Sequence, residues 1–152
     1  MAKDDILLNH YSSVVKYVQE AVSYFRALGF SDNVTFRDMD GHAENEVLPN
    51  EDFVCLKDFS GTTDENSSDW VFQIGVTTFE DENLFRHRAM MNYLMKKFIP
   101  LQEILVYDNE DKNTSYGRLI VKSDTTLQPF SKVNARAIQY LLVGASSTVP
   151  TL

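Results

Sequence analysis

The sequence predicts an α+β fold in which two amphipathic helices pack on an antiparallel or mixed β-sheet. Two segments carry apolar residues at steps of three and four, as one face of a helix does, and several others alternate as half-buried strands do. These segments do not alternate as regular β-α-β units, so we expect the helices to cover a sheet. The 152 residues show no repeat or linker, and we expect a single domain over residues 1–152.

The first predicted helix covers residues 4–28. Its apolar face is formed by Leu7, Tyr11, Val14, Val18, Val22 and Phe25. Asp4 and Asp5 complement the positive end of the helix dipole, and Gly29 is able to take the left-handed conformation that ends a helix. A helix with so large an apolar face needs a broad surface to pack on, and a sheet is the expected partner.

The middle of the chain predicts three strands. A short strand at residues 33–38 ends in the turn signal Asp40-Gly41, and residues 42–51 are polar and irregular. Residues 53–59 and 70–79 form a predicted hairpin, whose second strand places four apolar residues on one face, Trp70, Phe72, Ile74 and Val76. The segment between them, residues 60–69, has the composition of a long polar loop that is mobile or ordered by a partner.

The second half begins with three carboxylates, Glu80, Asp81 and Glu82, at the entrance to a second helix that ends at Pro100. Its apolar residues are Leu84, Met91, Leu94, Met95 and Phe98. Strands at 103–107 and 118–122 flank a predicted acidic loop, residues 108–117. Residues 134–144 fit a helix by composition and a strand by alternation, and we favour the strand. The tail, residues 146–152, is expected to be flexible.

Charge and cysteine content exclude some classes of function. The net charge of −8 opposes contact with a phosphate backbone over most of the surface, which argues against tight DNA binding. Basic residues gather only on the second predicted helix. Cys55 stands alone, so no disulfide is possible within the chain. We expect neither a signal peptide nor a membrane span, because no long apolar stretch is present.

No motif in the sequence predicts catalysis, a metal or a cofactor. His10, His42 and His87 lie in three separate segments, and we expect the two helical ones to be surface or partly buried residues. The turn around Gly41 lacks the first and last carboxylates of a calcium-binding loop. Cys55 is expected to pack as a small apolar residue. Phosphate-binding glycine loops and nucleophile elbows are absent from the sequence.

The order of these features resembles the tail terminator proteins of long-tailed bacteriophages. The resemblance is clearest from residue 53 to residue 100. There the segment Asp52-Phe53-Val54-Cys55-Leu56, the polar tip at residues 61–69, the strand that begins at Trp70, and the helix through Tyr93 and Leu94 to Ile99-Pro100 follow one another as in that family. The match is one of pattern and spacing rather than of a sharp motif.

The resemblance implies a tail-terminator-like fold and a structural role instead of an enzymatic one. It implies a homo-oligomeric ring, usually a hexamer, that caps the tail tube, stops its polymerisation and offers a surface to the head. The implied partners are other copies of the chain, the tail tube protein and a head-completion or connector protein. DNA would pass only as cargo, and no membrane or cofactor would be involved. The implied location is the head-proximal end of the virion tail, after assembly in the host cytoplasm.

Contact residues in such a ring are nominated by their chemistry. The two polar segments contribute Gly61, Thr62, Asp64, Asn66, Asp111, Asn113 and Tyr116, because long polar loops are able to order on assembly. The second helix contributes Arg86, Arg88, Lys96 and Lys97, which could pair with acidic loops of a neighbouring copy.

Two other interpretations remain open. Another head–tail connector or a baseplate component would share most of these features. A small-ligand-binding or enzymatic α+β domain would instead place an apolar pocket between its sheet and its helices.

Overall fold

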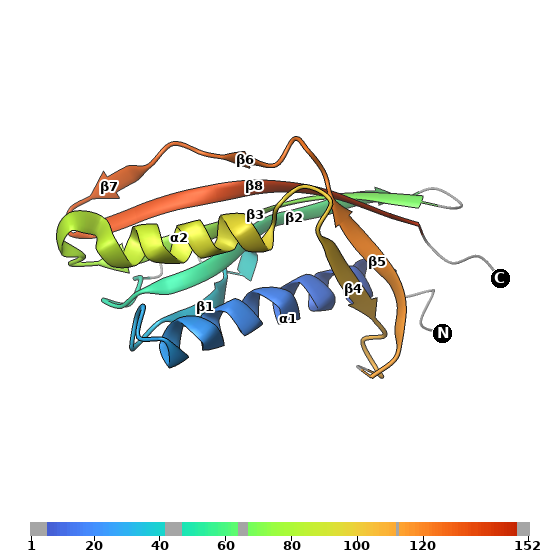
Figure 1. Cartoon of the computed structure of the whole chain (residues 1–152), viewed down its shortest axis with the longest axis horizontal. Helices are drawn as coiled ribbons and strands as arrows, with labels where there is room; N and C mark the ends of the chain where they lie inside the picture. The colour runs from blue at the N-terminus through green and yellow to red at the C-terminus, as the bar shows by residue number, and fades with distance from the viewer. Residues whose placement is uncertain (1–5, 42–46, 64–66, 112, 149–152) are drawn as a thin grey trace.

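The computed structural model describes residues 6–41, 47–63, 67–111 and 113–148, and it confirms the α+β class. A curled sheet carries two helices, α1 (Ile6–Ala27) and α2 (Phe85–Lys97), on one face (Figure 1). The first strands are β1 (Thr35–Asp38), β2 (Phe53–Thr63) and β3 (Ser67–Phe79), with the short 3₁₀ helices η2 (Met39–Gly41) after β1 and η3 (Glu82–Leu84) before α2. The later strands are β4 (Glu103–Tyr107), β5 (Ser115–Val121), β6 (Thr126–Leu127), β7 (Ser131–Val133) and β8 (Arg136–Thr148).

The described strands form one mixed sheet in the order β1-β2-β3-β8-β5-β4, with β6 and β7 paired to β8. Pairing is antiparallel except between β1 and β2, which run parallel. β1 and β2 are therefore neighbouring strands that are not joined as a hairpin. The connection between β1 and β2 is long enough for the chain to return to the end of the sheet at which β1 begins, as a parallel pair requires. The last long strand, β8, lies between β3 and β5.

The predicted loop at residues 60–69 is mostly strand, and that prediction was wrong. β2 continues to Thr63 and β3 begins at Ser67, with Ser60 opposite Val71 and Thr63 opposite Ser68. Residues 64–66 lie outside the described part. The polar residues mark an exposed stretch of hairpin rather than the absence of a strand, because backbone hydrogen bonds are made whatever the side chains are.

The end of the chain also differs from the prediction. Residues 134–144 are mainly strand, as favoured, but β8 runs on to Thr148. Residues 146–148, expected in a flexible tail, pair instead with the start of β3. Residues 149–152 lie outside the described part of the chain. β5 likewise begins at Ser115, inside the predicted loop 108–117.

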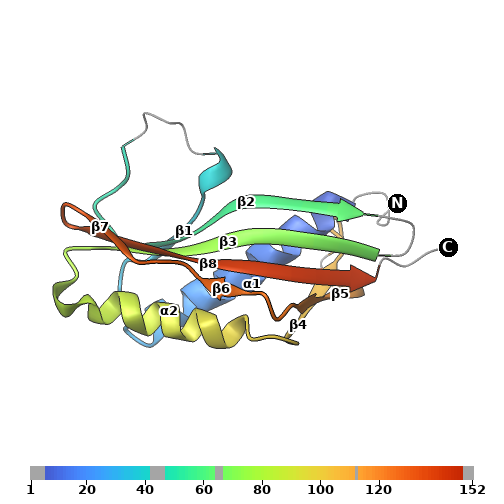
Figure 2. The ribbon, with the colours of Figure 1, turned by 90° about the horizontal axis from the view of Figure 1, so that it is seen from above.

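One buried cluster of side chains joins both helices to the sheet. Figure 2 shows the ribbon of these elements from above. The predicted face of α1 is buried at Val14, Val18, Val22 and Phe25, and the four predicted residues of β3 are buried as well. Tyr17 and Phe98 meet edge to face with ring centroids 5.3 Å apart, which links α1 to the end of α2. On the same predicted face, Tyr11 is partly buried and Leu7 is 61% exposed.

The described helix boundaries follow local chemistry. Gly29 has a φ of +73°, and Phe30 N donates to Phe25 O at 2.9 Å, which closes α1 as predicted. At the start of α2, the Asp81 carboxylate accepts from Arg86 N at 3.2 Å and from His87 N at 2.8 Å. Asp81 therefore stabilises the helix start, as expected. Asp4 and Asp5 lie outside the described residues.

Both helical histidines are buried, which corrects the expectation of surface or partly buried positions. His10 Nδ1 lies 2.7 Å from Ile6 O, and His10 Nε2 lies 2.9 Å from Ser147 Oγ. The ring also stacks on Trp70 with centroids 4.6 Å apart. His87 Nε2 lies 3.0 Å from Gln139 Oε1. Each histidine reaches a polar partner on the inner face of the sheet, and these contacts offset part of the cost of burial. His87 Nδ1 is buried without a hydrogen-bond partner among the described residues. His42 lies outside the described residues.

Cys55 packs in β2 as predicted. Its side chain is buried, and burial raises the pKa of the thiol to about 11, so it stays protonated at neutral pH. Among the described residues, no group of three or more His, Cys, Asp and Glu side chains gathers that could hold a metal ion. None of the described helices is long and apolar enough to cross a membrane.

Candidate functional site

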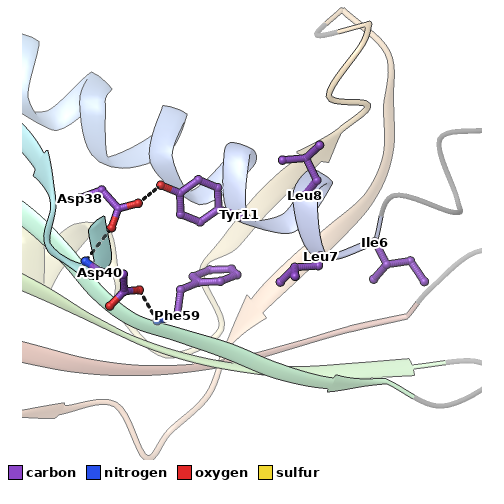
Figure 3. A pocket seen from close by; sticks show the side chains of 7 residues that line it. All are labelled: Ile6, Leu7, Leu8, Tyr11, Asp38, Asp40 and Phe59. Carbon is purple, nitrogen blue, oxygen red and sulfur yellow. Dashed lines mark hydrogen bonds between the residues drawn. The ribbon is translucent and has the colours of Figure 1, made fainter. Parts of the chain in front are cut away.

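An open groove lies between the first turns of α1 and the outer edge of β2 (Figure 3). It has a volume of about 480 Å³. Its lining combines five apolar or aromatic side chains with two carboxylates: Ile6, Leu7, Leu8, Tyr11, Phe59, Asp38 and Asp40. The apolar part is open to solvent, since Leu7 is 61% and Leu8 46% exposed. Exposed leucines beside a concave surface are typical of a binding site.

A bulge in β2 creates this groove. The register of β2 with β3 shifts between Lys57 and Ser60, and Asp58 has a φ of +55°. The Asp40 carboxylate accepts from Asp58 N at 2.8 Å and from Phe59 N at 3.2 Å, so one side chain satisfies both backbone groups at the bulge. The bulge turns Phe59 towards α1, where it meets Tyr11 edge to face at 5.4 Å between centroids.

The polar groups of the groove are engaged with one another. The Tyr11 hydroxyl donates to Asp38 Oδ2, and Asp40 N donates to Asp38 Oδ1 at 2.9 Å. Burial, assisted by the hydrogen bond to Asp38, raises the pKa of Tyr11 to about 12. The phenol therefore remains a donor at neutral pH and is unsuited to act as a base. The arrangement favours docking of an apolar group beside negative charge over acid–base chemistry.

The predicted contact residues of the β2–β3 hairpin take different roles. Gly61 lies under the ring of Trp70, where an added Cβ would come within 2.3 Å of Trp70 Cε3, so packing alone requires glycine here. Thr62 is exposed in β2 opposite Asp69. Asp64 and Asn66 lie outside the described residues.

The four predicted basic residues divide into two pairs. Arg86 Nε lies 2.8 Å from Asp52 Oδ2, and its guanidinium also donates to Phe79 O at 2.8 Å. Lys97 lies over the ring of Tyr17, 3.8 Å from its centroid, and 3.8 Å from a carboxylate oxygen of Glu20. Both cations are therefore engaged within the chain itself. Arg88 and Lys96 are exposed on the outer side of α2.

The predicted loop contacts around residue 111 form a turn. The Asp111 carboxylate accepts from Thr114 Oγ1 at 2.7 Å and from Asn113 N at 3.1 Å, and these bonds lower the pKa of Asp111. Asn113 is exposed beside it. Tyr116 belongs to β5 by its backbone. Asp111 and Asn113 are not among the described residues that line the groove.

Sequence reasoning missed every residue of the groove as a site. One signal was present: Leu7 and Leu8 are adjacent, and two adjacent residues of a helix cannot both lie at the centre of one buried face. The roles of Asp40 and Phe59 depend on the bulge, which follows from pairing with distant residues and leaves no local pattern.

No protein-family model matches the sequence, and no curated protein matches it. Several solved structures match the chain, and one of them is similar over 93% of this chain and 96% of its own chain, with a TM-score of 0.55 and 9% sequence identity. The name of that protein states no activity, ligand or partner. At this identity the likeness shows a shared fold alone.

Proposed function

We propose that this chain is the tail terminator of a long-tailed bacteriophage, a structural subunit of a ring that caps the tail tube and offers a surface to the head. The observation that carries the proposal is the open groove beside β2. Its apolar side chains face solvent, while its carboxylates already hold hydrogen bonds within the chain. Such a surface suits a protein neighbour better than a reaction.

The outer edge of β2 supports the same role. β1 pairs with β2 only as far as Leu56, and no described strand pairs with the outer side of Ser60–Thr63. Open strand edges are natural interfaces in assemblies and a hazard in free monomers. A ring needs one patch of a subunit to meet a different patch of the next, and the groove with its strand edge supplies one such patch.

Sedimentation velocity and negative-stain electron microscopy of the purified chain test this proposal. The expected result is a ring, with a ring fraction that rises with concentration. Added to polymerising tail tube protein of the same virus, the chain should shorten the tubes and be found at their ends. A chain that stays monomeric at every concentration, with or without tube protein, would contradict the proposal.

A small-ligand-binding domain is the second candidate, and the groove itself favours it. A volume of about 480 Å³ lies within the roughly 300–1,000 Å³ of small-molecule sites. This candidate predicts a bound apolar metabolite in native mass spectra of the purified protein. It also predicts that the NMR signals of the Tyr11 and Phe59 side chains change when the metabolite binds. Immunogold labelling of virions separates a baseplate component from a tail terminator, because a baseplate component would label the opposite end of the tail.

A further inference from the structure

The outer face of α2 is an exposed surface with apolar and basic side chains. Phe85 at its start is 73% exposed, Met95 in its last turns 42%, and Ile99 just beyond its end 53%. The spacing of these residues, with Arg88 between them, follows one side of the helix. Helices of soluble proteins normally present charge and polarity to water, so this apolar content on an outer face is suited to contact with a partner.

The charge of this face is positive. Arg88 and Lys96 are exposed, and the ion pairs among the described residues include neither of them. Arg86 and Lys97, on the same helix, are engaged with Asp52 and Glu20 instead. The outer face therefore offers two exposed cations beside its apolar side chains, and of these Arg88 also donates to Asn83 O at 3.4 Å.

The groove has the complementary character. Asp38 and Asp40 form its polar wall, and no ion pair with a basic side chain is found for either among the described residues. Their hydrogen bonds come from a phenol and from backbone N–H groups, which carry no formal charge. Leu7 and Leu8 provide the apolar part. An apolar helix face with basic residues is complementary to this surface in polarity and in charge.

We infer that the groove of one copy receives the outer face of α2 from the next copy of the chain. This rests on the proposed ring and names the two surfaces that would build it. Figure 2 places β2 and α2 on opposite flanks of the sheet, so one copy is able to use both surfaces at once. A contact between two unlike patches repeats from copy to copy and closes into a ring when the rotation allows.

The inference is tested with two variants, each blocked on one surface. Leu7→Glu with Leu8→Glu adds charge to the groove, and Arg88→Glu with Met95→Glu reverses the character of α2. All four side chains are exposed, so both variants should fold, and circular dichroism melts check this. Each variant alone should sediment as a monomer, because every contact would need its blocked surface.

Mixing the two variants gives the decisive result. The intact α2 of the groove variant should dock in the intact groove of the α2 variant, and the chain of contacts then stops. The expected species is a dimer at twice the monomer mass, with no ring. The control Val71→Glu changes an exposed residue of β3 outside both surfaces and should assemble as the unmodified chain does.

Three outcomes would overturn the inference. The first is that either blocked variant forms rings as the unmodified chain does. The second is that the mixture of two folded variants stays monomeric, which would leave the ring proposal standing with other contact surfaces. The third is that the unmodified chain forms no ring, which removes both proposals together. If a double variant unfolds, Leu8→Glu alone and Ile99→Glu alone replace the pair.

Discussion

The two halves of β2 differ in what covers their outer edge. The first half, from Phe53 to Leu56, pairs with β1 on one side and β3 on the other. The second half, from Ser60 to Thr63, pairs with β3, and no described strand covers its other side. The bulge separates them, and the Asp40 carboxylate takes the place of a strand there. The same strand thus serves as interior at one end and as surface at the other.

This difference separates stability from assembly along a single element. Residues of the covered half are buried, as Val54, Cys55 and Leu56 show, while side chains of the open half are exposed. Substitutions in the first half should therefore act on folding, and substitutions in the second half and its groove should act on self-association. The following predictions test that division, beginning with the largest effect.

Leu56→Ala and Thr62→Ala provide the strongest contrast. Leu56 is fully buried, so its truncation should cost about 2–5 kcal/mol of unfolding free energy. Thr62 is exposed in the open half, and its truncation should change that free energy by less than about 0.5 kcal/mol. Urea denaturation followed by circular dichroism measures both. Equal losses in the two variants would mean that the open half is also part of the interior.

Arg86→Met should destabilise the covered end, because Asp52 is buried immediately before β2 and would lose its cation. The expected cost is about 3 kcal/mol, since an uncompensated buried carboxylate remains. Arg88→Met on the same helix is the matched control and should leave urea stability unchanged. Burial alone would raise the pKa of Asp52, but the contacts led by the Arg86 side chain lower it below its usual value. The stability that the Arg86–Asp52 ion pair contributes should therefore be lost as the pH falls through the acid range. Arg86→Met should not show this loss, because it has no such ion pair.

Gly61→Ala sharpens the boundary between the two halves, because Gly61 is in the open half but lies under Trp70. An added methyl group has no room against the indole, so we expect a loss of about 2 kcal/mol of unfolding free energy. Thermal melts with Trp70 fluorescence as the signal should show the shift. Unchanged melting together with loss of assembly would identify Gly61 as a contact residue instead.

The smallest effect concerns His10, which fixes the first turns of α1 to the end of β8. Burial lowers the pKa of His10 below its usual 6.5, so the unfolded chain binds the proton more readily than the folded chain. Stability should consequently fall as the pH drops below about 6.5, by at most about 1.4 kcal/mol per pH unit. His10→Gln should flatten this part of a stability–pH curve measured by urea denaturation. A slope that survives the substitution would assign it to another group.

Local patterns predicted most of the fold. The spacing of Val14, Val18, Val22 and Phe25 identified the buried face of α1, and alternation from Trp70 to Val76 identified the inner face of β3. Composition misled at the hairpin tip and at the last strand, where polar residues lie in paired backbone. Of the nominated contact residues, Arg86, Lys97 and Gly61 serve the fold of the chain itself, and Arg88 and Lys96 remain exposed.

The sequence by itself determined the elements whose causes are local: two amphipathic helices, their boundaries at Gly29 and Asp81, and strands that alternate. Only the tertiary structure decided that β1 runs parallel to β2, that β8 inserts between β3 and β5, and that Asp40 closes the bulge. Periodicity reports which side of an element is buried, but pairing depends on residues far apart in the chain. The groove arises from such pairing, and for that reason no single stretch of sequence predicts it.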